Sequence, residues 1–490
     1  MVACAGVPHQ NFDLAAGGRE EMIRNGFDPD FSPAVEQQLN ALKTQPAPLA
    51  GDAIRDLRDR LWSSIDNDTS RDLDQIEVAE RVSGGTLVLV GIADVDASIP
   101  PGTPIDQHAS SQTTTVYTPG RVFPMLPELL STDLTSLAPG QDRLAVVIEM
   151  LVAADGTVAS SSIYRALVRN QFQLTYESIG PWLEGSAPLP ANLSAAAPLQ
   201  EQLKMQDEAA RRLREQRNRL GALNFDRVEA EPVIANGQVK DIAARRTNRA
   251  SALIEDFMLA ANEAMAQTLT RAGVSRIQRV VKAPERWPRI VQLAAQYGTA
   301  LPAQPDSGAL AAFLGEQRQK DPTHYPDLSL AIVKLMGPGE YVLTRAGDPE
   351  VGHFGLATHD YTHSTAPNRR FADLVTQRLV KAWLNKQPSV YSDDELDSIA
   401  HHCTERENAA RKVERAMNKR AAALAFSNRI GQSFPAVVTG VKDNGVFVRV
   451  LNPPVEGKLV RGEQGVDVGD TIRVTLLHTD PQNGFIDFGR

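Results

Sequence analysis

The chain has few cysteines and no long apolar run. Only Cys4 and Cys403 occur among its 490 residues, which excludes a disulfide framework and a cysteine-based zinc site and suits a reducing compartment. No run of about 18 apolar residues is present, and the opening "MVACAGVPHQ" lacks a basic start and a long apolar stretch, so the sequence predicts neither a membrane span nor a secretory signal. We therefore expect a cytoplasmic protein.

Positive charge is also scarce. The formal net charge is -9, so a nucleic-acid partner would have to be held by local basic surface. Residues 369–420 contain eleven Lys and Arg against eight Asp and Glu, several of the basic ones at helical spacing, and a basic face can form there. The hydrophobic content of 42% and the length predict a globular chain of roughly two to four domains.

The pattern of residues changes along the chain. Residues 1–50 predict a small helical arm, with helix-like pieces in "GREEMIRNG" and "SPAVEQQLNALK" and then a linker rich in proline. Residues 51–185 predict a mostly β core, because "GTLVLVGIADV" has strand length and "LAVVIEMLVAADGTVASSSIYRALV" reads as two strands around an Asp-Gly turn.

Helices follow these strands. Two charged helices are predicted to end at Gly221 and at Gly273, because glycine tolerates the left-handed conformation that closes a helix. In the next helix Phe371, Leu374, Val375 and Leu379 form one apolar stripe, and a capping box from Ser392 to Glu395 begins the last one.

The final sixty or so residues contain five short strand candidates separated by turns, which predicts a small OB-type barrel. In "GVFVRV", strand alternation puts Val446, Val448 and Val450 on one face and Phe447 and Arg449 on the other. The second face offers an aromatic ring and a cation to RNA. A barrel used only for packing remains an alternative.

Four aspartates, Asp66, Asp68, Asp72 and Asp74, stand within nine residues. Such charges repel one another unless a cation or solvent compensates them. Carboxylate oxygens are the hard ligands that magnesium prefers over a phosphodiester, but an acidic surface loop would have the same composition. A calcium loop of the EF-hand type is disfavoured, since its central Gly and final Glu are missing.

Four longer motifs, taken together in their order along the chain, resemble those of a known family. "IDNDTSRDLDQ", "GIADVDASIPPGTPIDQHA", "TTVYTPGRVFPMLPELLSTDLTSLAPGQDRLA" and "HFGLATHDYTHSTAPNRRFADLVTQRL" together resemble the ribonuclease II family, whose catalytic module is the RNB domain. The last five strands resemble the S-one type of RNA-binding barrel. The resemblance covers Ile54 to Arg490 and implies an α+β multidomain fold: an RNB domain over 51–428, with a mixed β-sheet core packed with helices, and a five-stranded OB-fold barrel over 429–490.

The resemblance implies a processive, hydrolytic exoribonuclease that takes single-stranded RNA from its 3′ end and releases nucleoside 5′-monophosphates with Mg²⁺, for which Mn²⁺ can substitute. It assigns Asp66, Asp72 and Asp74 to the metal and the attacking water. Gln75 stands where the family has a fourth acid and offers a neutral oxygen. Arg369 takes the place of the family's catalytic arginine, which stabilises charge on the phosphate.

The resemblance also implies RNA contacts. Tyr117 matches the aromatic that stacks on a nucleotide, and Tyr176 matches a tyrosine near the terminal sugars. Glu414 matches a base-contacting glutamate, although an i,i+4 helical ion pair is an alternative. The second half of the aromatic clamp is not evident, with Pro284 near its place and Trp287 as the candidate.

Two departures shape the remaining expectations. Fifty residues cannot hold the family's cold-shock-type domains, so we expect a more open channel that tolerates duplex near the 3′ end, in a monomer that binds no membrane. Gln75 raises the alternative of an RNA-binding protein with a weakened catalytic centre, and a hydrolase of another phosphoester is a second alternative. His353 and His363 lack metal-binding spacing.

Overall fold

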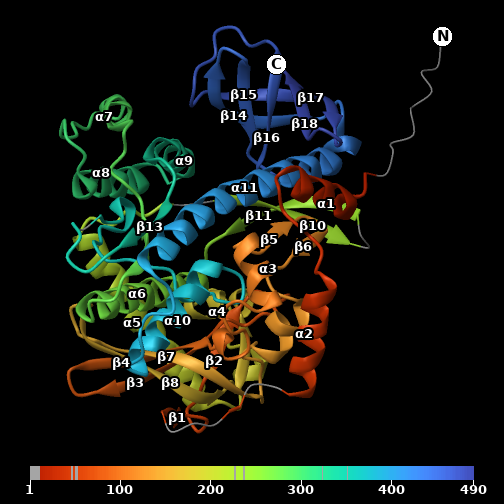
Figure 1. Cartoon of the computed structure of the whole chain (residues 1–490). Coiled ribbons are helices and arrows are strands. Elements are labelled where there is room, and N and C mark those ends of the chain that lie inside the picture. Colours follow the sequence, from red (N-terminus) through yellow and green to blue (C-terminus); the bar gives the residue numbers. More distant parts are fainter. Residues whose placement is uncertain are drawn as a thin grey trace.

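The computed structural model describes residues 12–45, 48–49, 53–225, 228–235, 238–322, 324–349 and 351–490. Cys4 and part of the predicted linker lie outside the described residues. The described part forms a mixed sheet wrapped by helices, a smaller helical lobe and a closed barrel, which one long helix connects (Figure 1).

A seven-stranded mixed sheet carries the main core, in the order β1-β8-β7-β4-β3-β2-β9. Its strands are β1 (Ile54–Asp56), β2 (Ser63–Asp66), β3 (Gln75–Val82), β4 (Gly85–Ala93), β7 (Asp142–Val152), β8 (Val158–Arg169) and β9 (Phe172–Thr175). Neighbours are antiparallel except at the two edges, where β1 pairs with β8 and β9 pairs with β2 in parallel. The hairpin of β7 and β8 turns at Asp155 and Gly156, as predicted.

Helices cover both faces of this sheet. The described helices are α1 (Leu14–Arg24), α2 (Pro33–Thr44), α3 (Pro104–Gln112), α4 (Tyr176–Leu183), α5 (Ala197–Arg219), α6 (Arg249–Arg271), α7 (Trp287–Gln296), α8 (Ser307–Lys320), α9 (Tyr325–Met336), α10 (Phe371–Leu384) and α11 (Asp393–Phe426). Val88 and Val90 pack toward α5 and α6 in one core, and Leu89 packs toward α3 and α10 in the other. The alternation along β4 therefore separates the two cores.

Shorter pairs of strands lie outside the sheet. They are β5 (Val116–Thr118) with β6 (Arg121–Phe123), β10 (Val228–Ala235) with β11 (Gln238–Arg246), and β12 (Arg276–Val280) with β13 (Glu340–Thr344). The α7, α8 and α9 helices form a lobe with its own apolar core. Neither this lobe nor the β10–β11 hairpin was predicted from the sequence.

The predicted barrel is confirmed. Its strands are β14 (Ser433–Lys442), β15 (Gly445–Val450), β16 (Val455–Arg461), β17 (Thr471–Asp480) and β18 (Phe485–Gly489), closed in the order β14-β15-β16-β18-β17. On β15, Val446, Val448 and Val450 are buried and Phe447 and Arg449 are half-buried, as strand alternation predicts.

The longest helix joins these parts. The predicted capping box is present, since Ser392 and Glu395 exchange hydrogen bonds at the start of α11. Leu396 near that start packs in the sheet core, and Phe426 at the end packs in the barrel core. In Figure 1 this helix runs from the sheet to beneath the barrel.

The N-terminal helices pack on the rest of the chain. α1 begins at Leu14, earlier than predicted, because the Asp13 carboxylate caps it by accepting hydrogen bonds from two backbone N–H groups. Leu14 and Met22 pack with Val116 of β5 and Val413 of α11. No helix among the described residues has both the length and the apolar character required to cross a membrane.

Candidate active site

The predicted aspartate cluster lies on the loop between two adjacent strands. β2 ends at Asp66, a turn follows at Asp68 and Thr69, and β3 begins at Gln75. Because β2 and β3 are antiparallel, the loop brings its two ends back together. Asp68 is exposed at the turn, whereas Asp74 has 4% of its surface exposed, so this loop is not simply a solvated acidic surface.

Negative charge on this loop is poorly compensated. Burial raises the pKa of Asp74 to about 7, Asp72 and Asp373 push it in the same direction, and Arg369 opposes them. Burial also raises the pKa of Asp72, and the charge of Asp66 adds to that shift. The loop therefore holds several carboxylates close together, and Arg369 compensates their negative charge only in part.

Arg369 faces this loop from a distant part of the chain. Its Nε lies 3.4 Å from Oδ2 of Asp74, and the backbone N–H of Asn368 lies 3.4 Å from Oδ1 of the same carboxylate. The Arg369 carbonyl accepts a hydrogen bond from the N–H of Thr115 at 2.9 Å. The Arg369 side chain is still 41% exposed, so its remaining donors can reach a ligand.

The adjacent arginine is arranged differently. Arg370 donates to both oxygens of Asp373, at 2.8 and 2.7 Å, and Asp373 is fully buried. Asp373 also accepts a hydrogen bond from the N–H of Ala366 at 2.8 Å. Arg370 therefore holds the turn before α10, and its charge is neutralised within the protein.

Tyr117 stands on β5 with 43% of its surface exposed. Desolvation raises the pKa of its hydroxyl, the charges of Asp72, Asp74 and Asp66 add to the shift, and Arg369 opposes them. The strand of Tyr117 lies beside the site, because the N–H of Thr115, two residues earlier, donates to the Arg369 carbonyl. A planar ring that is exposed next to carboxylates is suited to stacking on a base.

Glu414 supports this strand. Its Oε1 accepts a hydrogen bond at 3.1 Å from the backbone N–H of Tyr117. Burial raises the pKa of Glu414, and this hydrogen bond lowers it. Within the described part of the chain Glu414 forms no ion pair along its helix, so the alternative i,i+4 pairing is absent from the structure.

Tyr176 and Gln75 lie beside the loop. Tyr176 follows Thr175, whose Cα is paired with that of Asp66 between β9 and β2. Burial raises the pKa of the Tyr176 hydroxyl, and the charge of Asp66 contributes. Gln75 is the first residue of β3 and is buried, with 8% of its surface exposed. Both residues thus adjoin the aspartates in space.

The barrel residues stand apart from this loop. Phe447 is half-buried, and the ammonium of Lys442 lies 5.8 Å from the centre of its ring. Arg449 forms an ion pair with Asp327 of α9, with Nη2 and Oδ1 2.5 Å apart, and its side chain is 13% exposed. In this arrangement Arg449 links the barrel to the helical lobe.

Trp287 is not a stacking residue, and this expectation was wrong. Only 2% of its surface is exposed, and its Nε1–H donates to the carbonyl of Pro302 at 2.8 Å. It packs in the apolar core of the α7–α9 lobe. A tryptophan at the start of an amphipathic helix most often packs in the core, and the sequence alone could not distinguish this role from stacking on a base.

His353 and His363 both pack against the ring of Tyr361. Burial lowers the pKa of His353 to about 4 and that of His363 well below its usual value. Nδ1 of His363 lies 2.8 Å from the Tyr341 hydroxyl. As the side chains stand, no three acidic, histidine or cysteine residues in the described ranges form a metal-binding group.

A buried charge network, which the sequence reading missed, fixes α10 to the sheet. Arg378 pairs with Asp96 at 2.9 Å and with Asp106 at 2.8 Å, and Lys381 pairs with Asp94 and Asp96 at 2.7 Å each. These acids belong to the motif "GIADVDASIPPGTPID". Its carboxylates therefore hold the helix that follows Arg369, and a helical Arg and Lys three positions apart were the available signal.

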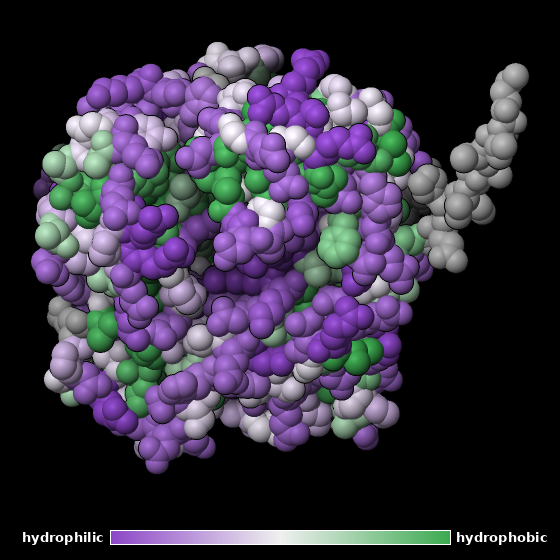
Figure 2. Space-filling view, turned by 90° about the horizontal axis from the view of Figure 1, so that it is seen from above, coloured by the Kyte–Doolittle hydropathy of each residue, from purple (hydrophilic) through white to green (hydrophobic). Residues whose placement is uncertain are grey.

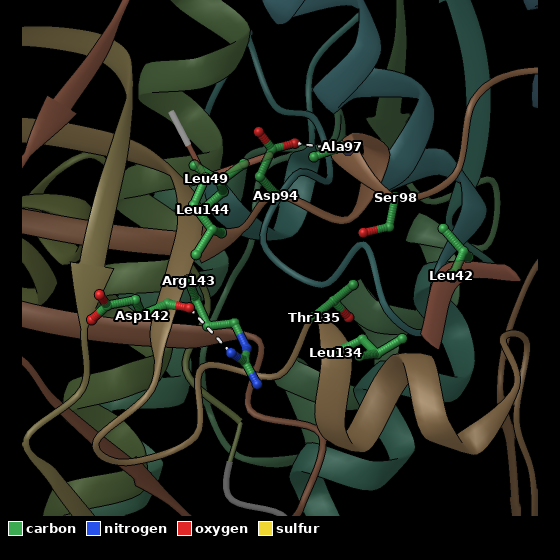
Figure 3. Close-up of a pocket in the computed structure, with 10 residues that line it drawn as sticks. All are labelled: Leu42, Leu49, Asp94, Ala97, Ser98, Leu134, Thr135, Asp142, Arg143 and Leu144. Carbon is green, nitrogen blue, oxygen red and sulfur yellow. Dashed lines mark hydrogen bonds between the residues drawn. The ribbon is translucent and has the colours of Figure 1, made fainter. Parts of the chain in front are cut away.

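A pocket of about 250 Å³ opens beside Thr135 and Arg143 (Figure 3). It is lined by Leu42, Leu49, Asp94, Ala97, Ser98, Leu134, Thr135, Asp142, Arg143 and Leu144. Thr135, on its wall, lies 2.8 Å from Oδ1 of the buried Asn368. The pocket is therefore next to a residue that supports the site, and its lining does not include Asp66, Asp72 or Asp74. The surface view shows a mostly hydrophilic face with a hollow near its centre (Figure 2).

Comparison with protein families gives two matches. Residues 54–386 match the RNB domain, and residues 432–490 match the RNase II-type exonuclease C-terminal S1 domain. The first match covers more than half of the chain.

Curated relatives are similar over most of this chain. It is 29% identical over 497 aligned residues to ribonuclease R of Thermotoga maritima, covering 94% of this chain and 68% of the relative. It is 31% identical to ribonuclease R of Escherichia coli, covering 86% of this chain and 53% of the relative. The chain thus spans about half the length of the second relative.

Solved structures have the same fold. RNase R of Mycoplasma genitalium in complex with ribose-methylated single-stranded RNA superposes with a TM-score of 0.88, 24% identity, and coverage of 98% of this chain and 78% of that one. A complex of the same protein with double-stranded RNA gives 0.87 and 25%, over 98% and 83% of the chains. Yeast Ssd1, a pseudonuclease, gives 0.72 and 18%, over 92% and 56%. The fold therefore occurs with and without nuclease activity. Whether this chain cleaves RNA depends on the residues of its site.

Proposed function

This chain belongs to the RNB-domain family, and from that premise we propose that it is a hydrolytic 3′-to-5′ exoribonuclease. It would remove nucleoside 5′-monophosphates processively from single-stranded RNA. The observation that carries the proposal is the loop with Asp66, Asp72 and Asp74, which faces the half-exposed guanidinium of Arg369 beside the exposed ring of Tyr117. A carboxylate cluster, a phosphate-binding cation and a base-stacking ring are the three parts that this reaction requires.

The protein groups have separate tasks in this proposal. Arg369 binds a phosphate oxygen of the bond to be cleaved and stabilises the charge that develops on it. Asp66, Asp72 and Asp74 surround the position of the attacking water, and two of their carboxylates orient it by accepting its two hydrogen bonds. The Asn368 N–H and Arg369 Nε hold one oxygen each of Asp74, which keeps the water-binding and phosphate-binding groups in register.

Carboxylate oxygens are the donors that a hard divalent cation prefers, and we propose Mg²⁺, or Mn²⁺ in its place, bound once these side chains turn toward one another, since no three of them converge as they stand in the described residues. The raised pKa values of Asp72 and Asp74 mark negative charge that the protein leaves uncompensated, and Gln75 adds a neutral oxygen. When bound by Asp66, Asp72, Asp74 and Gln75, the cation would supply Lewis acidity toward water and phosphate.

Two tyrosines would bind the nucleotides next to the site. Tyr117 stacks on a base, and Tyr176, beside Asp66, lies near the sugar of the 3′ end. Glu414 supports the strand of Tyr117 through the backbone. Phe447 of the barrel would stack on RNA farther from the site, and Arg449 would be a further contact only when its ion pair with Asp327 opens.

The proposal also covers the kind of RNA that is accepted, the oligomeric state and the cellular location. The hydrophilic hollow of Figure 2 suits a charged strand, and we propose that RNA with duplex near its 3′ end is also accepted. A monomer acting in the cytoplasm is part of the same proposal.

The test is the time course of 5′-labelled single-stranded RNA with Mg²⁺ on a sequencing gel. The wild type should shorten RNA progressively to a small limit product, and Asp74→Asn should not. Asp68→Asn is the matched control, because it removes the same charge from the exposed turn of the same loop and should behave as wild type.

A second candidate function is RNA binding without cleavage. It is favoured by Gln75 in the place of an acid and by the occurrence of this fold in a pseudonuclease. Intact RNA in the wild-type reaction, with binding retained, would establish it and reject the exonuclease.

A further inference from the structure

A second guanidinium group reaches the aspartate loop at its other end. Nη2 of Arg245, near the end of β11, donates a hydrogen bond to Oδ1 of Asn67, the residue after Asp66. β11 is anchored on the far side, because Ile242 packs in the barrel core and Asp241 pairs with Arg429 at 2.7 Å. The β10–β11 hairpin thus carries a cation from the barrel to the beginning of the loop.

The charge of Arg245 is not neutralised by these contacts. Asn67 is a neutral amide, and the nearby acid, Glu231, lies 3.7 Å away with 56% of its side chain exposed. A pair of this kind is screened by solvent and contributes little. By contrast, Arg370 shares two hydrogen bonds with a fully buried carboxylate. The Arg245 side chain is 38% exposed, so part of its five-donor fork remains accessible.

Arg245 and Arg369 contact the two ends of the same loop. Arg245 meets Asn67, the residue after Asp66, and Arg369 faces Asp74. The antiparallel pairing of β2 and β3 brings these two ends together. An RNA strand that crosses the loop would therefore pass both guanidinium groups.

We propose that Arg245 binds a backbone phosphate of the RNA strand as it passes Asp66, as a second phosphate contact besides Arg369. This inference rests on the proposed function, since it assumes an RNA substrate. A polyanion that approaches three aspartates is repelled unless cations stand on its path. A guanidinium fork meets that need because it binds phosphate through two parallel hydrogen bonds.

The experiment measures binding, without turnover, as a function of salt. Single-stranded RNA is titrated against the Asp74→Asn protein in chelator between about 50 and 200 mM salt, because each phosphate contact contributes about 0.7 to the slope of log affinity against log salt. Adding Arg245→Ala should weaken binding about five- to tenfold at the lower salt concentration and reduce the slope by about 0.7. Arg245→Lys should keep the slope, because it keeps the charge.

Asn67→Ala is the control that distinguishes RNA binding by Arg245 from a purely structural role of Arg245 in holding the loop. It removes the hydrogen bond to Arg245 and leaves the cation in place, so the salt slope should be unchanged. If Asn67→Ala and Arg245→Ala weaken binding equally and neither changes the slope, Arg245 only tethers the loop and the proposal is overturned. If the Asp74→Asn protein binds no RNA at all, the proposed function fails as well. Arg245→Lys also guards against misfolding of the alanine variant.

Discussion

Glu414 of α11 and Tyr117 of β5 are joined by a hydrogen bond of 3.1 Å from the backbone N–H of the tyrosine to the carboxylate. The carboxylate therefore fixes the strand that presents the ring, and α1 packs on the same strand through Leu14. The longest helix of the protein thus takes part in the site through the backbone of a neighbouring element.

From this relationship we predict that Glu414→Ala weakens RNA binding through Tyr117. Tyr117→Ala should cost about 1–3 kcal/mol of binding free energy, the usual value of one stacked base, and Glu414→Ala should cost part of it. Glu414→Gln keeps an acceptor for the N–H and should bind RNA almost as wild type does. A large loss in Glu414→Gln that is additive with Tyr117→Ala would contradict this role and indicate direct contact with a base.

The raised pKa of Asp74 predicts a pH dependence of stability in the absence of metal. A carboxyl with a pKa near 3.8 when unfolded and about 7 when folded binds more protons in the folded state between these values, so the free energy of unfolding should fall as pH rises from about 4 to 7. The loss is at most on the order of 4 kcal/mol. Denaturant unfolding in chelator at pH 4 and pH 8 measures it.

Asp74→Asn should remove this loss and be more stable than wild type at pH 8, with little difference at pH 4. Asp68→Asn, at the exposed turn, should unfold as wild type does at both pH values. Equal pH slopes in wild type and Asp74→Asn would show that the buried carboxyl does not titrate in this range.

Addition of Mg²⁺ or Mn²⁺ should stabilise the folded protein. A ligand at about 100 times its dissociation constant contributes about 2.7 kcal/mol, which corresponds to a rise in Tm of a few degrees for a chain of this size. The rise should be lost in Asp72→Asn and retained in Asp68→Asn. A rise of the same size in both variants would place the cation elsewhere.

How much of this site could be predicted depends on the range of the interactions. The barrel, the capping box at Ser392 and the helix ends at Gly221 and Gly273 follow from local patterns, and the structure confirms them; both glycines have positive φ, 93° and 66°. The acids of the loop were found by their density. Their relation to Arg369 came from a family resemblance, because no local rule brings residues so far apart in sequence together.

The residues that the sequence reading missed are set by long-range contacts. Nothing in "DIAARRTNRA" distinguishes Arg245, which meets Asn67, from its neighbour Arg246. Trp287 was misassigned because burial in the α7–α9 core is a tertiary property. Side-chain partners across elements override local propensity, and they decide function here.

The buried network on α10 predicts a large effect on stability at a distance from the site. Arg378 is 1% exposed and pairs with two carboxylates, so Arg378→Ala leaves the Asp106 carboxylate without its ion pair and Asp96 with Lys381 alone, and should cost about 3–5 kcal/mol. Arg289→Ala, on the exposed side of α7, should change stability by less than about 0.5 kcal/mol. Equal unfolding midpoints for the two variants would show that the network contributes nothing net.

The ion pair between Arg449 and Asp327 gives the last prediction, because it competes with any role of this arginine in RNA binding. With Asp327 2.5 Å away, the charge of Arg449 is largely neutralised, so Arg449→Ala should weaken RNA binding less than about twofold. Asp327→Asn releases the guanidinium and removes an acid of α9 that faces the barrel, and it should tighten binding by about one phosphate contact at low salt. Fluorescence anisotropy with labelled single-stranded RNA measures both. A loss of several-fold in Arg449→Ala, with no gain in Asp327→Asn, would instead mean that the arginine leaves its partner for RNA and that the barrel moves away from α9 when the strand binds.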